Sequence, residues 1–230
     1  MLSLEEIVLT MKQRFFIAGT DASSPVNLFS CALLEEANQK GLTSLGLKPV
    51  ATGCTDIDGE LKSAEVLNLM ANSTIQLSYQ QVNPFALSAV TTPHIAAEMV
   101  EVRMSADRIK AYMSGALMRS VNLALVEGVY GWRAPINDRE SMASVAQALG
   151  FPVILVVDLN DDTINQTLLT LEAIRRDGLS LAGWIVSQAR SEYDDRSVDW
   201  LRRVFPAPFL GSISTNIDES GELDLSPLGL

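Results

Sequence analysis

Short apolar runs alternate with longer amphipathic stretches along most of the chain. The apolar runs predict buried strands, and the stretches between them repeat their apolar positions at helical spacing. We expect strands at residues 14–19, 44–50, 122–128, 151–159, 179–187 and 207–211. We expect helices at residues 25–40, 62–71, 104–121, 141–150, 163–178 and 193–204, with an irregular segment, rich in Asn, Ser, Thr and Pro, at 72–95.

This alternation predicts one α/β domain, doubly wound, with helices on both faces of a mostly parallel sheet. The expected organisation is an N-terminal extension at 1–11, a domain at 12–212 and an acidic, loosely held tail at 213–230. Ligands of such sheets bind beyond the carboxyl ends of the strands. That rule directs the search for a site to three segments, at residues 19–27, 48–56 and 127–132.

Charge narrows the choice of partners. The 230 residues include 28 acidic and 17 basic side chains, a formal net charge of −11. This excess argues against nucleic acid or an anionic membrane surface as the main partner. The sequence has no apolar run of the roughly 18–20 residues that a membrane span needs, and its first ten residues do not read as a secretory signal. Cys31 and Cys54, without CxxC spacing, indicate reduced thiols and a cytoplasmic protein.

The segment after the first strand invites comparison with a phosphate-binding loop, G-x-x-x-x-G-K-[ST]. Gly19 supplies the first glycine. With one more residue between the two glycines than this motif has, Pro25, Val26 and Asn27 stand where the second glycine, the lysine and the hydroxyl residue belong. Because proline has no N–H and valine no charge, two of the phosphate-binding groups of this motif are missing. Asn27 could still offer an oxygen to Mg²⁺.

Two further segments carry candidate chemistry. Lys48 follows the second strand, where it is either a surface lysine or a cation for a bound carboxylate or phosphate. Glu127 ends the third strand beside two glycines, where it either holds a metal or an amine, or caps a helix or forms a salt bridge. Asp21 and Glu65 are possible oxygen ligands for Mg²⁺, although acidic loops are commonly just solvated. The lone His94 is interpreted as structural.

The order of several motifs is more specific than any one of them. RFFIAGTD (14–21), GLKPVATG (46–53), QVNPF (81–85) and LVEGVYGW (125–132) resemble segments of the dethiobiotin synthetase family, of the P-loop NTPase class. The resemblance spans residues 12 to about 212. It implies a cytoplasmic homodimer that uses ATP and Mg²⁺ to close a ring on a small diamine carboxylate, 7,8-diaminopelargonic acid, with CO₂. A carbamate forms first and its oxygen is phosphorylated; the second amine then displaces phosphate.

The resemblance also implies roles for individual residues. Lys48 is the implied catalytic residue, holding carbamate and phosphate charge. The implied substrate contacts are Thr52, Cys54, Gly128, Gly131 and Asn165, the last near the substrate carboxylate of the partner subunit. The implied nucleotide contacts are Gly19, Asp21 and Asn27, and the implied magnesium ligands are Asp21, Glu65 and Glu127.

Three departures from the family pattern cluster on nucleotide and substrate contacts. Besides the loop, Ser187 and Gln188 replace the asparagine–aspartate pair that reads adenine, and Asp161 and Asp162 precede Asn165. The leading hypothesis is a dethiobiotin-synthetase-like protein whose ATP-dependent activity is weakened or lost. One alternative is a working enzyme in which another cation, such as Arg133, replaces the loop lysine. The other is a pseudoenzyme that serves as a dimeric binding or regulatory protein.

Overall fold

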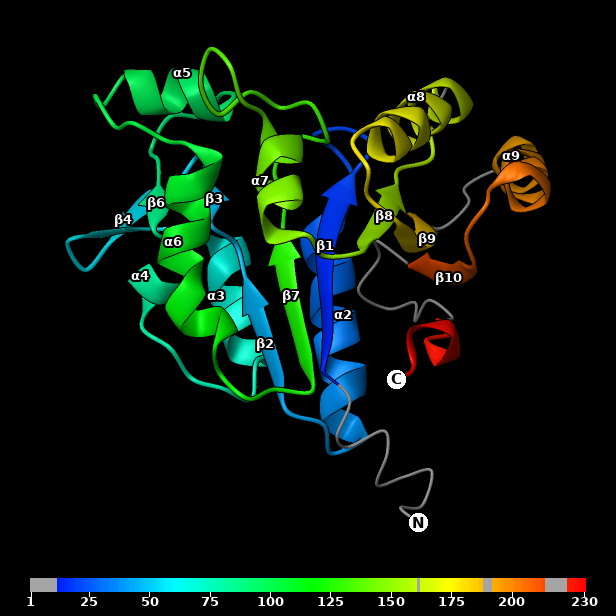
Figure 1. Ribbon diagram of the computed structural model, residues 1–230, viewed down its shortest axis with the longest axis horizontal. Coiled ribbons are helices and arrows are strands. Elements are labelled where there is room, and N and C mark those ends of the chain that lie inside the picture. The colour runs from blue at the N-terminus through cyan, green and yellow to red at the C-terminus, as the bar shows by residue number, and fades with distance from the viewer. Residues whose placement is uncertain (1–11, 161, 188–191, 214–222) are drawn as a thin grey trace.

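A parallel sheet forms the centre of the computed structural model, which describes residues 12–160, 162–187, 192–213 and 223–230 (Figure 1). Its six strands lie in the order β10-β9-β8-β1-β7-β2, and every neighbouring pair is parallel. They are β1 (Gln13–Gly19), β2 (Ser44–Leu47), β7 (Leu123–Glu127), β8 (Val153–Val157), β9 (Leu181–Ser187) and β10 (Phe209–Ile213). The predicted α/β class and its parallel sheet are confirmed.

Helices cover both faces of this sheet. Side chains alternate along the strands, so Phe16 and Val126 belong to one core, while Ile17 and Leu125 belong to the other. Figure 1 shows α2 (Val26–Gln39) behind the sheet and α7 (Met142–Leu149) in front of it. The other helices are α3 (Ala64–Asn72), α4 (Tyr79–Val82), α5 (Pro93–Glu98), α6 (Ala106–Leu117), α8 (Thr163–Arg176), α9 (Glu192–Val204) and the 3₁₀ helix η1 (Ser226–Leu228). None of these described helices is long and apolar enough to cross a membrane.

The position of β1 decides where a ligand can bind. It lies between β7 and β8. Strands β7 and β2 lie on one side of β1, and β8, β9 and β10 lie on the other, so the strand order changes direction at β1. A crevice forms beyond the carboxyl ends of the strands at such a switch in strand order. The loops that follow β1, β2 and β7 meet there, as the sequence predicted.

The segment expected to be irregular contains regular structure. It includes α4, α5 and β6 (Phe85–Ala86), which pairs with β3 (Val50–Ala51). A hairpin of β4 (Thr55–Ile57) and β5 (Glu60–Lys62) turns at Asp58 and Gly59, both at positive φ, as tight hairpins prefer. Elements of two to six residues are too short to show a hydrophobic period, so the sequence pattern could not reveal them.

The C-terminal tail is not loosely held where the structure describes it. Leu225 and Leu228 are buried in the core on the α2 side, and Leu223 forms a β-bridge with Gly211. The acidic composition of the tail concealed these spaced leucines. The predicted extension at 1–11 and the remainder of the tail, 214–222, lie outside the described residues.

Candidate active site

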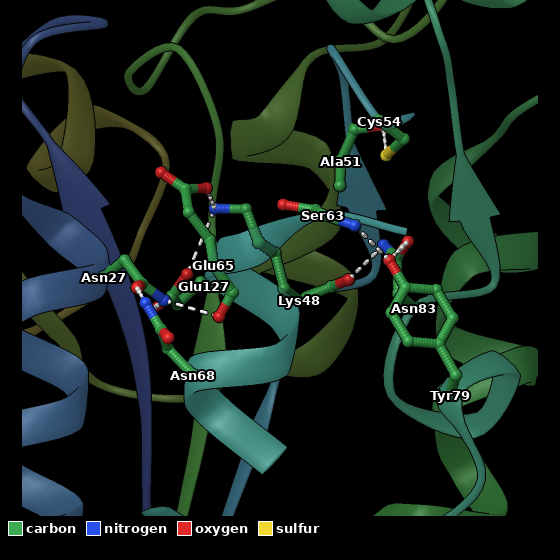
Figure 2. A network of polar contacts seen from close by, with 10 residues as sticks. All are labelled: Asn27, Lys48, Ala51, Cys54, Ser63, Glu65, Asn68, Tyr79, Asn83 and Glu127. Carbon is green, nitrogen blue, oxygen red and sulfur yellow. Dashed lines mark hydrogen bonds and ion pairs between the residues drawn. The ribbon is translucent and has the colours of Figure 1, made fainter. Parts of the chain in front are cut away.

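Lys48 and Glu127 form a buried ion pair at the carboxyl edge of the sheet (Figure 2). Strands β2 and β7 are parallel neighbours with Leu47 opposite Val126, so the next residue of each strand, Lys48 and Glu127, also lies side by side. Lys48 Nζ is 3.0 Å from Glu127 Oε2, and the two side chains are 4% and 0% exposed. The Lys48 and Glu127 that the sequence singled out are thus direct partners.

Glu65 provides a second carboxylate for the same lysine. Its Oε2 lies 2.9 Å from Lys48 Nζ, and its side chain is 54% exposed. Burial alone would lower the pKa of Lys48, but the charges of Glu127 and Glu65 outweigh it and raise that pKa above its ordinary value. Burial raises the pKa of Glu127, and Lys48 only partly offsets the shift. Lys48 therefore stays an ammonium ion throughout the physiological range.

Asn27 joins the start of α2 to this ion pair. Its side-chain amide donates to Glu127 Oε1 at 3.3 Å and to the backbone carbonyl of Glu65 at 2.9 Å. Its Oδ1 accepts a hydrogen bond of 3.3 Å from Asn68 of α3. The amide oxygen that could have faced a metal ion is thus directed to Asn68 (Figure 2).

A cavity of about 230 Å³ opens in front of Lys48. Its lining brings together seven of the residues that the sequence predicted: Gly19, Asp21, Lys48, Thr52, Glu65, Gly128 and Gly131. Ser24 and Tyr130 also line it. Neither was a candidate from the sequence, although Ser24 lies within the loop motif and Tyr130 lies between the two glycines.

Within the loop after β1, the backbone N–H groups at positions 23–26 are already bound. Asp21 Oδ1 accepts from the N–H of Ser23 at 2.8 Å and from that of Ser24 at 3.0 Å. The N–H of Val26 donates to the Ser24 carbonyl at 2.7 Å, and Pro25 has no N–H to donate. Across the four positions 23–26, every backbone N–H that exists has a partner inside the loop.

The loop is also narrow, and a second loop crosses it closely. A Cβ at Gly19 would lie 2.6 Å from the Ser24 Cβ, so the Ser24 side chain occupies the space above Gly19. A Cβ at Gly131 would lie 3.3 Å from the Thr20 carbonyl oxygen. Gly131 has a φ of 94° and Tyr130 a φ of 60°, and the latter is strained for an aromatic residue.

Two of the predicted substrate contacts do not line this cavity. Cys54 is buried, its Sγ lies 3.6 Å from the Ala51 carbonyl, and burial raises the pKa of its thiol. Asn165 is exposed near the start of α8. A contact between Asn165 and a partner subunit's ligand stays a prediction.

Two other side chains at or near the expected nucleotide contacts, Arg133 and Ser187, have partners elsewhere in the protein. The guanidinium of Arg133 pairs with Asp177 at 2.8 and 3.0 Å, so it is not a free replacement for the loop lysine. Ser187 is buried, and its Oγ accepts from the N–H of Leu159 at 2.9 Å. Gln188 and Asp161, two of the other departures from the family pattern, lie outside the described residues.

The implied magnesium ligands do not form a ready metal site. In the part of the chain that the structure describes, no group of three or more His, Cys, Asp or Glu side chains is arranged to hold a metal ion. Lys48 lies between Glu65 and Glu127, and Asp21 is bonded within its own loop. These carboxylates face an ammonium ion and N–H groups.

Solved structures of low sequence identity share this fold. The signal recognition particle receptor FtsY of Elizabethkingia anophelis superposes with a TM-score of 0.57 at 10% identity, over 98% of this chain and 68% of that one. The septum site-determining protein MinD of Pyrococcus horikoshii, complexed with Mg-ADP, gives 0.54 at 14% identity, over 90% and 82%. The parallel sheet with helices on both faces defines a fold of the P-loop NTPase class.

Sequence relatives narrow the class to a family. A family model described as an AAA domain matches residues 13–222. The ATP-dependent dethiobiotin synthetase BioD of Cellvibrio japonicus is 42% identical over 224 residues, covering 94% of this chain and 98% of that protein. The enzyme of the same name from Pseudomonas aeruginosa is 37% identical with the same coverage. The chain belongs to the dethiobiotin synthetase family.

Proposed function

We propose that this protein keeps the substrate side of a dethiobiotin synthetase site, while its ATP-dependent ring closure is weakened or lost. The family reaction joins 7,8-diaminopelargonic acid and CO₂ with the use of ATP and Mg²⁺. The observation that carries the proposal is the contrast between an intact Lys48 cluster and a loop in which Asp21 already binds the N–H groups of Ser23 and Ser24.

The loop geometry supports weak phosphate binding. A phosphate normally takes its hydrogen bonds from N–H groups of this loop and the following helix start. Here Asp21 accepts those of Ser23 and Ser24, so an incoming phosphate must displace a carboxylate of its own charge sign. The missing loop lysine removes a charge-assisted contact of roughly 1.5–3 kcal/mol.

The charges around the cavity act in the same direction. Among the described residues that line it, Lys48 is the one cationic side chain, and it faces Glu65 and Asp21 with Glu127 directly beneath. A triphosphate would therefore meet more negative than positive charge. Since these carboxylates form no three-ligand metal site, no step through magnesium follows from them.

Lys48 remains suited to a small anion such as a carbamate. Its raised pKa keeps the ammonium charged, and half-exposed Glu65 can turn outward to release one of its bonds. The Thr52 hydroxyl and the backbone beside Gly128 border the same cavity. When bound, ATP would supply the phosphoryl group that activates the carbamate oxygen.

A product assay tests the proposal. The purified protein is mixed with 7,8-diaminopelargonic acid, bicarbonate, Mg²⁺ and ATP, and dethiobiotin is followed by mass spectrometry beside an active synthetase. We expect product to be absent or formed far more slowly than by the active enzyme, and any product to vanish in Lys48→Ala. Product at the rate of the active enzyme would overturn the proposal.

The contrast between the intact Lys48 cluster and the altered loop also favours a second function, in binding and not in catalysis. A chain that keeps the cavity and Lys48 but not a free loop could serve as a dimeric binding or regulatory protein. Its ligand would be a small carboxylate or diamine, and exposed Asn165 on α8 would serve the site of a second copy. Light scattering after size exclusion separates the homodimer from a monomer. Thermal stabilisation by 7,8-diaminopelargonic acid without ATP tests binding.

A further inference from the structure

A segment remote in sequence holds the backbone of Lys48 from both sides. The N–H of Lys48 donates to the carbonyl of Val82 at 3.2 Å. The carbonyl of Lys48 accepts from the side-chain amide of Asn83 at 2.6 Å. Asn83 is a buried polar residue just after α4, and Figure 2 shows its amide turned toward Lys48. Both polar backbone groups of the site lysine therefore depend on one short segment.

Tyr79 extends this support to the helix that carries Glu65. Its hydroxyl donates to Asn83 Oδ1 at 3.2 Å and accepts from the N–H of Ser63 at 2.8 Å. Ser63 is the N-cap residue of α3, and Glu65 lies in the first turn of that helix. Without Tyr79, that N–H at the start of α3 would need another acceptor.

These contacts form a closed ring. It runs from the Lys48 carbonyl through Asn83, Tyr79 and Ser63 into the first turn of α3, and returns through Glu65 to Lys48 Nζ (Figure 2). The ring fixes the backbone of the lysine and the base of its half-exposed carboxylate together. A lysine side chain has several rotatable bonds. Because the Lys48 backbone is fixed at one end and the base of Glu65 at the other, fewer positions of Nζ allow the ion pair to form.

We propose that Tyr79 and Asn83 are positioning residues, which hold Lys48 and Glu65 at their mutual distance across the candidate site. This rests on the proposed role of Lys48 as the cation of that site. Neither residue was a candidate from the sequence, and neither lines the cavity in front of Lys48. They act on Lys48 through hydrogen bonds from behind.

The test follows the Lys48 ammonium directly by NMR of the full chain with ¹⁵N-labelled lysine. A buried, paired ammonium exchanges its protons with water slowly, and Lys48→Met identifies its signal by removing it. In Tyr79→Phe and Asn83→Ala, each of which loses two hydrogen bonds of the ring, we expect exchange at least about 3- to 10-fold faster, the factor that the loss of a single hydrogen bond gives an opening equilibrium. Tyr112→Phe, a change at an exposed tyrosine outside the ring, is the matched control and should leave the exchange unchanged.

The outcomes separate positioning from mere structural support. A lower melting temperature in Tyr79→Phe and Asn83→Ala with unchanged exchange and chemical shift at Lys48 would overturn the inference. The signal needs no turnover, so that failure would leave the proposed function standing. Conversely, dethiobiotin formed at the rate of an active synthetase would overturn the proposed function and leave the NMR result valid.

Discussion

The ammonium of Lys48 lies 3.0 Å from the carboxylate of Glu127, and neither side chain is more than 4% exposed. Two charges removed from water offset their desolvation only while they remain paired. The pair therefore makes the site intolerant of change at either residue, independently of any catalytic role.

Replacing Glu127 by glutamine should destabilise the protein strongly. Lys48 would keep only half-exposed Glu65 as a charged partner, and we expect a loss of about 3 kcal/mol in the free energy of unfolding, measured with urea. The control is Glu36→Gln in the exposed Lys40–Glu36 pair, which should cost less than about 1 kcal/mol. Equal losses in the two variants would contradict the buried pair.

The positive φ of Tyr130 predicts that glycine at this position gives a more stable protein than alanine. Its φ of 60° suits glycine, so Tyr130→Gly should be more stable than Tyr130→Ala by about 1 kcal/mol, since both remove the ring and only glycine relieves the backbone. Neighbouring Val129 is not among the positive-φ residues, so there alanine should be the more stable of the two. Thermal unfolding of the four variants measures both orders. Alanine above glycine at position 130 would refute the strain.

The raised pKa of Tyr79 predicts that the protein loses stability in alkali. Burial raises the pKa of this phenol from 10.0 to about 12, although the Ser63 N–H opposes the shift. A pKa that is higher in the folded state gives stability that is complete below about pH 10 and is lost as the pH rises toward 12. The melting temperature of the wild type should therefore exceed that of Tyr79→Phe most below pH 10. If the difference in melting temperature between the wild type and Tyr79→Phe grew as the pH rose, it would contradict a raised pKa of Tyr79 in the folded state.

Much of the fold could be predicted because the strands are apolar on both faces. The apolar runs at 14–19, 44–50 and 122–128 predicted strands of the sheet, and the strand-end rule directed attention to the segments that begin with Lys48 and Glu127. That these two side chains are partners came from the structure. The β3–β6 pair was missed because two-residue strands are recognised only by their pairing, which joins Val50 to Phe85. The packed end of the tail was missed because an acidic composition concealed its leucines.

The sequence predicted those site residues that lie in or next to a recognisable motif. It did not predict the contacts that depend on the folded conformation of a loop or on segments distant in sequence. Asp21 was identified as a loop residue, but its bonds to the Ser23 and Ser24 N–H groups depend on the loop conformation. Asn83 lies 35 positions from Lys48 in the chain, so no local pattern relates them. Arg133 directly follows the LVEGVYGW segment (125–132), yet it pairs with Asp177.

Calorimetric titration of Mg·ATP tests the central claim, the loss of phosphate binding in the loop after β1. The wild type is compared with the triple variant Pro25→Gly, Val26→Lys and Asn27→Thr, after thermal melting has shown that both are folded. We expect no measurable heat of binding in the wild type and clear binding in the triple variant, which regains the N–H at position 25 and an ammonium group at position 26. Equal, tight binding by both would contradict the central claim.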